Sequence, residues 1–271
     1  MEYDFLGSAY INTCPSELDL ALLSIRNQTL KPCKVILVVD GPLSFDIQSF
    51  LKNHSSYLNI KLLELKQNYG LGLALRKGLQ LCSSELILRF DTDDFNLNTR
   101  AEKQIKFMME GNYDIISSYI YEYVDLPEKI QNIKKVPLSQ KKIKLMLPFR
   151  NPFNHPAICF RLKAIKELNG GYRHFPFYED YDLWIRALNS GLKCANIAEP
   201  LVGMNSNGLI NRRINKMMFL KEAKLFKTFY DFSFIDFILF IPSFCIRTLI
   251  LFLPKYFVEK LYKVFLRSKK S

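Results

Sequence analysis

Three carboxylates stand within four positions in the segment RFDTDDFN, at Asp91, Asp93 and Asp94. Carboxylates this close repel one another unless water separates them or a cation lies between them. A magnesium or manganese ion held by one or two carboxylates keeps its other positions for water and phosphate oxygens, which suits a nucleoside diphosphate. The alternative is a solvated acidic turn in which Asp94 or Asn98 caps the next helix.

A second acidic pair, Glu179 and Asp180, follows Gly170 and Gly171, which end the preceding helix. The apolar residues after the pair recur at helical spacing, so the pair occupies the first turn of a helix. Carboxylates there are favoured by the helix dipole even when they do no chemistry. A carboxylate in this position can also accept the proton of a hydroxyl group, and the local sequence leaves both interpretations open.

Strand and helix patterns alternate from residue 4 to about 120, and they determine where the acidic groups lie. This βαβαβαβ order is the signature of an open, mostly parallel central sheet flanked by helices, and it places the chain in the α/β class. The expected strands are residues 5–10, 34–39, 60–65 and 85–90, and the expected helices open at Ser16, near Ile47 and after Gly72.

In such a sheet, ligands bind beyond the carboxyl ends of the strands. Asp40 ends the second expected strand, and residues 91–94 follow the fourth. Both acidic positions should therefore emerge at one edge, which is where a nucleotide site is expected. Asn68 and Gly70 should shape a turn at that edge, and no GxGxxG pattern indicates a dinucleotide.

Composition limits the class of protein. The chain has 271 residues, of which 49% are hydrophobic and 24% charged, as in a globular protein with a sizeable core. The six cysteines show no CxxC pair and no zinc spacing, which indicates reduced thiols in the cytosol. The acidic N-terminus lacks the apolar region of a signal peptide. Residues 211–271 hold 13 Lys or Arg and 4 Asp or Glu, a net charge of +9 out of +12.

The motifs together resemble those of family 2 glycosyltransferases with the GT-A fold, a Rossmann-like architecture. The similar segments, in the family's order and spacing, are residues 38–42 (VVDGP), 68–75 (NYGLGLAL) and 89–94 (RFDTDD). The resemblance covers about residues 5–205 and is strongest to bacterial enzymes of exopolysaccharide, O-antigen and amylovoran biosynthesis. It implies a GT-A domain over residues 1–210, with a donor half up to about 120 and an acceptor half from about 121 to 210.

The resemblance implies donor contacts at the sheet edge. Asp40 matches the family's contact to the nucleobase, and Tyr10 would lie under the base. Relatives usually carry a Tyr-Asn pair at this strand end, where the chain has Ala9 and Tyr10, so the details of base recognition stay open. Arg76 stands where many relatives have Asn, and it is either an exposed helical arginine or a contact to the donor diphosphate.

The acidic cluster matches the family's DxD motif. By this match Asp91 faces the ribose and shares with Asp93 the binding of Mn²⁺ or Mg²⁺, while Asp94 has a supporting role. The ion would offset the negative charge on the departing diphosphate.

The resemblance also places Glu179 and Asp180 at the acceptor hydroxyl. An inverting transfer needs one carboxylate to take the acceptor proton, so Asp180 is the expected base and Glu179 the fallback. His155 and Asn154 match an Asn-His-Pro motif near the acceptor or the diphosphate, although His155 could equally be a structural histidine. Trp184 is expected to support the helix.

Residues 211–271 form a basic, aromatic tail that is expected to be helical. Residues 232–253 are strongly apolar, but Asp236, Pro242 and Arg247 interrupt them. Monotopic attachment to an anionic membrane surface is the favoured interpretation, ahead of a spanning or re-entrant helix and ahead of packing in a soluble core. The mixture of Lys with large aliphatic residues and Phe argues against nucleic acid as the partner.

The sequence therefore predicts an inverting, metal-dependent hexosyl- or N-acetylhexosaminyltransferase. Its donor would be a nucleotide-diphosphate sugar such as a UDP-sugar, and its acceptor a saccharide linked to a polyprenyl diphosphate. Its expected place is the cytoplasmic face of the bacterial inner membrane. A sugar-phosphate nucleotidyltransferase would require a Gly-rich, Arg-bearing loop after the first strand, which residues 10–15 lack. A non-catalytic membrane adaptor is the third interpretation.

Overall fold

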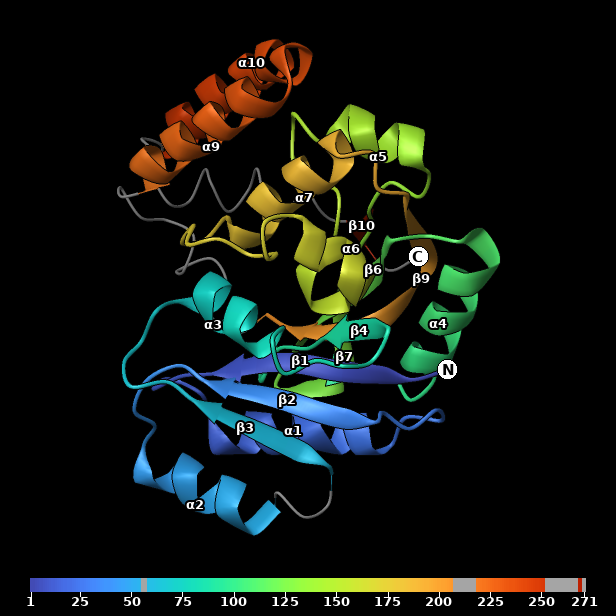
Figure 1. The fold of residues 1–271 in the computed structure, drawn as a ribbon, viewed down its shortest axis with the longest axis vertical. Helices are drawn as coiled ribbons and strands as arrows, with labels where there is room; N and C mark the ends of the chain where they lie inside the picture. The colour runs from blue at the N-terminus through green and yellow to red at the C-terminus, as the bar shows by residue number, and fades with distance from the viewer. Residues whose placement is uncertain (55–57, 207–217, 252–267, 270–271) are drawn as a thin grey trace.

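Four parallel strands form one half of the central sheet, in the spatial order β3-β2-β1-β4 (Figure 1). The computed structural model describes residues 1–54, 58–206, 218–251 and 268–269. The first three strands are each followed by a helix, as the alternating pattern predicts. The bounds are β1 (Tyr3–Ala9), α1 (Pro15–Arg26), β2 (Lys34–Val39), α2 (Phe45–His54), β3 (Ile60–Glu64), α3 (Leu71–Gly78) and β4 (Leu86–Arg89).

Strand β2 shows why this half is buried on both faces. Val35, Leu37 and Val39 belong to the core on the side of α1 and α2, whereas Ile36 and Val38 belong to the core on the side of α3. Successive side chains of a strand point to opposite faces, so an uninterrupted apolar run is suited to a sheet covered on both sides. The α/β class predicted from this run is confirmed.

The second half of the sheet is mixed. Strand β8 lies between β4 and β6 and is antiparallel to both, while β9 runs parallel to β6. The elements are β5 (Phe95–Asn96), α4 (Arg100–Gly111), β6 (Ile115–Val124), β7 (Leu126–Lys134), α5 (Gln140–Met146), the 3-10 turn η1 (His155–Ala157), β8 (Cys159–Arg161), α6 (Leu162–Glu167), α7 (Glu179–Asn189) and β9 (Cys194–Asn205).

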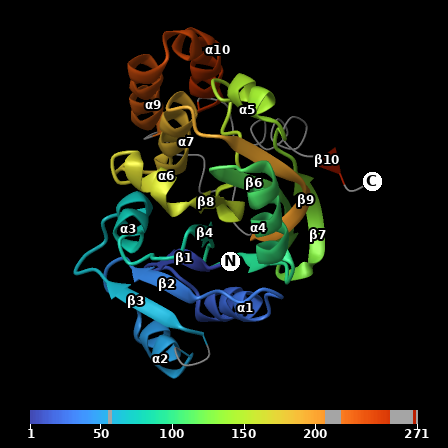
Figure 2. The same cartoon turned by 45° about the vertical axis from the view of Figure 1, so that its right-hand side comes forward.

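Helices cover the sheet in two layers (Figure 2). Residues of α1, α2 and α4 share one core with the sheet, and residues of α3, α6 and α7 share the other. The second half of the chain is thus built onto the same sheet as the first half.

The structure gives the second half local detail and contradicts one alternative. Residues 125–142, a polar stretch of the sequence, contain β7, which pairs antiparallel with β6. The apolar residues 157–160 span the end of η1 and the start of β8. Helix α4 has Thr99 at its N-cap position and no side-chain cap, so neither Asp94 nor Asn98 caps it. Asp94 faces inward and Asn98 offers its carbonyl to the Thr29 amide at 2.8 Å.

The described part of the tail is a helical hairpin, α9 (Met218–Phe232) and α10 (Phe234–Leu251), packed against α7. Leu225, Phe229 and Phe240 are fully buried in the same core as α7. Ser243 also donates a hydrogen bond to the carbonyl of Phe149 at 2.9 Å. Packing in a soluble core, the least favoured interpretation of the tail, is therefore present on one side of the hairpin. Residues 207–217 and 252–267 lie outside the described residues, so the predictions that fall on them cannot be compared.

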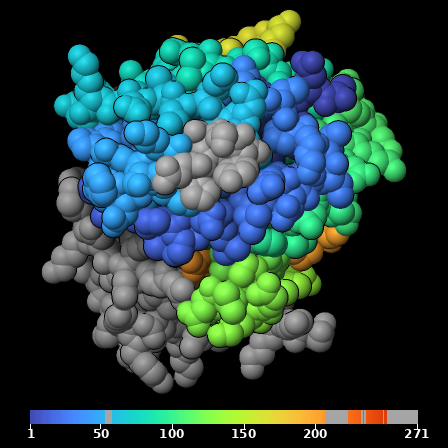
Figure 3. Space-filling view, turned by 90° about the horizontal axis from the view of Figure 1, so that it is seen from below, coloured from blue at the N-terminus to red at the C-terminus, as the bar shows by residue number. Residues whose placement is uncertain are grey.

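The hairpin lies at the end of the molecule opposite α2 (Figure 1). Seen from below, from the α2 end, the surface is formed mainly by the N-terminal half of the chain, coloured blue to green (Figure 3). No helix within the described residues is long and apolar enough to cross a membrane. The strand pair β10 (Ser268–Lys269) and β7 closes the sheet on the side away from β3.

Candidate functional site

The predicted donor residues lie at the carboxyl edge of the parallel strands. Tyr10 follows β1 and Asp40 follows β2, and the Asp40 amide donates to the Ala9 carbonyl at 2.8 Å. The Phe90 amide donates to the Leu6 carbonyl at 3.0 Å. Strand β4 is thus paired with β1 up to its end, and the residues after β4 lie at the same edge. The structure thus gathers at one edge the residues that the sequence predicted there.

Asp91, Asp93 and Asp94 form one compact acidic cluster. Each offers a carboxylate oxygen, and the three oxygens lie within 4.8 Å of one another. Asp94 is buried and accepts a hydrogen bond from the Asn205 amide at 3.1 Å. Burial, followed by the charges of Asp91 and Asp93, raises the pKa of Asp94 well above its usual value. Oxygen ligands this close to one another fit a divalent cation.

A buried arginine, Arg89, holds the first carboxylate of this cluster. Its side chain is only 2% exposed, and both of its terminal nitrogens donate to the two oxygens of Asp91. Arg89 is the last residue of β4 and Asp91 lies two residues beyond it, so the ion pair forms where the strand ends. The sequence analysis missed Arg89, although an arginine in an apolar strand two residues before an aspartate is the expected pattern of a buried ion pair.

Glu179 and Asp180 occupy the first turn of α7, as predicted. Asn151 donates to one oxygen of Asp180 at 2.6 Å and the Tyr181 amide to the other at 2.7 Å, which fixes the orientation of this carboxylate. Burial raises the pKa of Asp180 above its usual value, and these two hydrogen bonds and the charge of Arg89 offset only part of this rise. Burial, followed by the charge of Asp180, raises the pKa of Glu179 to about 7.

His155 lies beside this pair on η1. Its Nε2 is 2.9 Å from the Tyr172 hydroxyl, and its ring packs edge-on against the Trp184 ring. Burial, followed by the charge of Arg89, lowers the pKa of His155 well below its usual value, so the imidazole is neutral at pH 7. Trp184 is fully buried and supports α7, as expected.

Asn154 has a different place from the predicted one. Its side chain is fully buried, and Nδ2 donates to the Ser118 carbonyl at 2.9 Å. A side chain without exposed surface cannot reach an acceptor or a diphosphate. This geometry assigns Asn154 to holding η1 against β6.

Asp40 holds the glycine-containing turn before α3. Its two carboxylate oxygens accept the amides of Tyr69 at 2.8 Å and Gly70 at 2.9 Å. Gly41 has a φ of +89°, and a Cβ there would lie 2.7 Å from the Asn68 nitrogen. Only glycine allows this close approach at position 41. The hydrogen bonds of Asp40 and the close packing at Gly41 together hold the turn, so Asp40 shapes the edge of the site.

The comparisons with known proteins agree with this geometry. The pattern described as Glycosyl transferase family 2 matches residues 9–168. The chain belongs to glycosyltransferase family 2.

Two relatives match nearly the whole chain. The UDP-Gal:alpha-D-GlcNAc-diphosphoundecaprenol beta-1,3-galactosyltransferase of Escherichia coli is 36% identical over 268 residues, which cover 98% of this chain and 97% of the relative. The amylovoran biosynthesis glycosyltransferase AmsE of Erwinia amylovora is 30% identical over 262 residues, covering 96% and 98%. Membership of the family and glycosyltransferase activity, both predicted from the motifs, are confirmed.

Crystal structures of S. aureus TarS have the same fold. TarS 1-349 gives a TM-score of 0.65 at 14% identity, covering 98% of this chain and 74% of TarS 1-349. Its complex with UDP gives 0.61 at 16% identity, covering 82% and 65%. The predicted GT-A fold of this glycosyltransferase is confirmed by these matches.

Arg76 of the glycosyltransferase points toward the acceptor half. A Cβ added to Gly170 would lie 2.9 Å from a guanidinium nitrogen of Arg76, so the side chain extends over the turn between α6 and α7. Among the described residues, Arg76 forms no hydrogen bond or ion pair. The structure therefore brings Arg76 to the Gly170 turn, and its donor contact stays a prediction.

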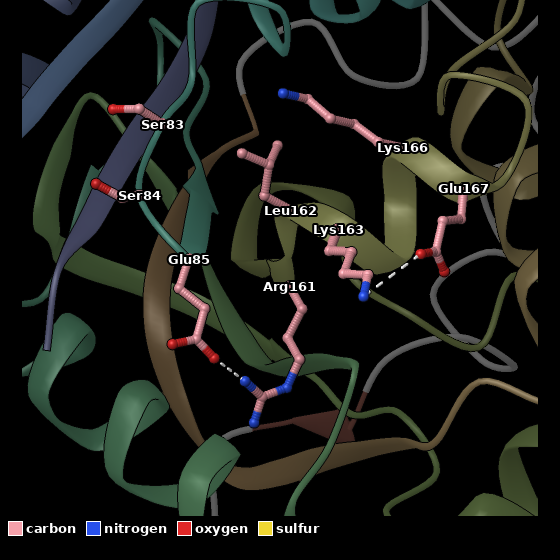
Figure 4. A pocket seen from close by; sticks show the side chains of 8 residues that line it. All are labelled: Ser83, Ser84, Glu85, Arg161, Leu162, Lys163, Lys166 and Glu167. Carbon is pink, nitrogen blue, oxygen red and sulfur yellow. Dashed lines mark hydrogen bonds and ion pairs between the residues drawn. The ribbon is translucent and has the colours of Figure 1, made fainter.

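A separate hollow of about 750 Å³ lies between α6 and the segment before β4 (Figure 4). Ion pairs between Glu85 and Arg161 and between Lys163 and Glu167 cross part of its wall. It borders the amino end of β4, whereas the acidic cluster follows the carboxyl end. The hollow is thus distinct from the predicted site.

The raised pKa of Glu179 predicts a pH-dependent stability. Between the unfolded value of 4.5 and about 7, the folded protein retains a proton that the unfolded chain releases. The free energy of unfolding therefore falls as pH rises through this window. One pKa unit corresponds to about 1.4 kcal/mol. Across the window, the free energy of unfolding of wild type should therefore fall by up to about 3 kcal/mol more than that of Glu179→Gln.

Urea unfolding on both sides of the window measures this difference. Glu110→Gln is the matched control, because Glu110 is exposed on α4 and its removal should leave the pH dependence of wild type intact. Identical pH dependence in wild type and Glu179→Gln would contradict the buried geometry of Glu179.

Proposed function

We propose that this glycosyltransferase moves a sugar from a UDP-sugar to a lipid-linked saccharide acceptor, with inversion, in bacterial surface polysaccharide synthesis. One observation carries the proposal: buried Arg89 pairs with Asp91 of the acidic cluster, and the charge of the same guanidinium also lowers the pKa of Glu179 and Asp180. The name of the E. coli relative supports the donor and acceptor classes, and the UDP complex of TarS supports the nucleotide.

The acidic cluster is the site we assign to Mn²⁺ or Mg²⁺. Asp93 and Asp91 would hold the ion, and buried Asp94 would support it from behind. When bound, the ion supplies positive charge that stabilises a departing nucleoside diphosphate. Arg89 fixes Asp91 by its two hydrogen bonds, so this ligand is oriented before any donor arrives.

Donor recognition would use the remaining residues of the edge. Tyr10 is half-exposed beside Asp40 and offers a ring surface for a base. Asp40 fixes the turn at Tyr69 and Gly70 on which the nucleoside would rest. Asp91 would face the ribose from the opposite side.

Asp180 is the proposed general base. As the acceptor oxygen bonds to the anomeric carbon, its proton passes to Asp180, and the bond between that carbon and the donor phosphate oxygen breaks on the opposite face. Asn151 and the Tyr181 amide orient the Asp180 carboxylate and offset part of the rise in its pKa that burial causes. Glu179, whose pKa is raised to about 7, is partly protonated at neutral pH, and it is the fallback.

A membrane surface is the proposed partner of α10. Seven uncharged residues at helical spacing form one exposed stripe, the α10 stripe, on the side away from the core. Its ends, Ile235 and Leu249, are 72% and 66% exposed. Lys224 and Lys227 of α9 are exposed nearby and suit anionic headgroups. The members of the α10 stripe are Ile235, Ile238, Leu239, Pro242, Cys245, Ile246 and Leu249.

This arrangement fits monotopic attachment, and we assign it to the cytoplasmic face of the inner membrane. An apolar stripe buried in the interface would bring the active site to an acceptor anchored in the same surface.

Asp93→Asn should abolish manganese-dependent binding of UDP. Ligand that binds only the folded protein stabilises it by about 2.7 kcal/mol at 100 times Kd, so Mn²⁺ with UDP should raise the melting temperature of wild type. Asp93→Asn should show no rise, whereas Asp19→Asn, a surface change on α1, should behave as wild type. A full shift in Asp93→Asn would remove Asp93 from the metal site.

Asp180→Asn should lower transfer by about 100-fold or more, because the acceptor proton has no base to receive it. The manganese-dependent shift with UDP should persist, which separates loss of the base from loss of donor binding. Transfer of radiolabelled sugar to a synthetic acceptor measures the rate. Near-normal transfer in Asp180→Asn together with loss in Glu179→Gln would move the role to Glu179.

The double variant Ile235→Glu/Leu249→Glu should weaken vesicle binding by at least about tenfold, because each buried aliphatic side chain contributes about 1.5–3 kcal/mol. Sedimentation with vesicles containing anionic lipid measures the binding. Phe45→Glu is the matched control, since Phe45 is an exposed apolar residue on α2, at the opposite end of the molecule. Equal binding of the double variant and wild type would refute the assignment of the α10 stripe.

A further inference from the structure

Helix α5 has an exposed face on which one leucine lies between two lysines. Leu145 is 66% exposed, and Lys141 and Lys142, four and three residues before it, are exposed as well. Residues three and four positions apart are neighbours on a helix surface, so the two lysines flank the leucine. The opposite face is anchored, because Ile143 is fully buried in the core that includes α7. We call the exposed side chains of Lys141, Lys142 and Leu145 the α5 face.

The segment after α5 lies against α10. Phe149 is 45% exposed, and its carbonyl accepts the hydrogen bond from Ser243 of α10 at 2.9 Å. Burial raises the pKa of Asp236 in the first turn of α10, whereas the charge of Lys144 lowers it, so the first turn of α10 lies near α5. Both views show α5 next to the hairpin, at the end of the molecule away from α2 (Figures 1 and 2).

The same segment reaches the proposed base. The Tyr181 hydroxyl of α7 donates to the Leu147 carbonyl, and the Asn151 side chain donates to Asp180 at 2.6 Å. Phe149 lies midway between these two contacts in the chain. The exposed apolar residues therefore belong to a segment that also orients the Asp180 carboxylate.

Charge indicates what could cover the α5 face. Helix α5 has three lysines and no acidic residue. An apolar side chain flanked by lysines suits an anionic lipid surface, because the apolar group enters the interface while the lysine stems extend to the headgroups. An exposed leucine alone is ordinary. Leu23 of α1, for example, is 45% exposed, but Asp19 lies four positions before it and α1 contains no lysine.

We propose that the α5 face and Phe149 form a second contact with the anionic membrane surface, in addition to the α10 stripe, an inference that rests on the function proposed above. A single helix stripe leaves a protein free to roll about the helix axis, whereas a second contact beside it fixes the orientation. This orientation keeps the segment that holds Asp180 next to the surface in which a lipid-linked acceptor is anchored.

Tryptophan placed at this surface tests the contact without any turnover. Trp184 is the only tryptophan of the chain and is fully buried, so vesicles of brominated anionic lipid should leave its fluorescence unchanged. In Leu145→Trp, the same vesicles should quench the added fluorescence. Leu249→Trp reports the α10 stripe in the same way. Leu23→Trp is the matched control, because it replaces an exposed leucine on α1, and it should show no quenching.

The outcomes separate this inference from the proposed function. Quenching in Leu249→Trp but not in Leu145→Trp would overturn the inference and leave attachment through the α10 stripe intact. No quenching in either variant would overturn the inference together with the membrane assignment. A blue shift of Leu145→Trp with rising protein concentration, in the absence of vesicles, would also overturn it, by assigning the α5 face to a second copy of the chain.

The lysines of the α5 face give a second, independent measurement. Lys141→Gln/Lys142→Gln should weaken sedimentation with anionic vesicles by about tenfold or more, because each lysine near such a surface contributes about fivefold. Binding to vesicles of neutral lipid should not change. Lys61→Gln/Lys66→Gln is the matched control, because it removes the same charge from β3 and the residues after it. An equal loss in both double variants would overturn the inference, since net charge alone would then explain the binding.

Discussion

The buried ion pair between Arg89 and Asp91 is the interaction on which the site depends. Removing a guanidinium from water costs several kcal/mol, and the Asp91 carboxylate, two residues beyond the end of β4, offsets this cost by accepting two hydrogen bonds. The pair neutralises one of three clustered carboxylates and so limits their repulsion. The charge of Arg89 also lowers the pKa of Glu179, Asp180 and His155. One buried cation therefore sets the electrostatics of both the acidic cluster and the acidic pair.

The second half of the sheet places α7 and η1 beside that ion pair. Strand β8 lies beside β4, and the amide of Arg89 donates to the carbonyl of Ile158 at 3.0 Å, which places η1 next to the acidic cluster. Trp184 and Tyr172 then fill the space between η1 and α7, and both are fully buried. Because close-packed side chains leave little freedom, the position of the acidic pair is fixed by the core rather than by the loop before it.

Sequence patterns predict the parallel half of the fold well because each of its strands is a short-range signal. The run in β2 is apolar on both faces, and the acidic cluster follows β4 directly. Strand β7 escaped prediction because its half-exposed, charged residues resemble a loop, and only its long-range pairing with β6 makes it a strand. Arg89 has a local signal, an aspartate two residues later, whereas Asn151 escaped because its role depends on a partner that the fold supplies. For Asn151 the partner is 29 residues away, and no periodicity reports such a contact.

The α9–α10 hairpin shows how one segment can satisfy two opposed interpretations of its sequence. A helix that is apolar all around is expected in a core or in a membrane, and α10 has features of both. One face buries Phe240 against Phe229 of α9, in the core that includes α7, and the other exposes the α10 stripe. Asp182 of α7 connects the hairpin to the helix that carries the acidic pair. It accepts hydrogen bonds from Arg173 and Arg186, and the Thr228 hydroxyl of α9 lies 3.4 Å from it. The packing of the hairpin and the position of α7 are therefore coupled through Asp182.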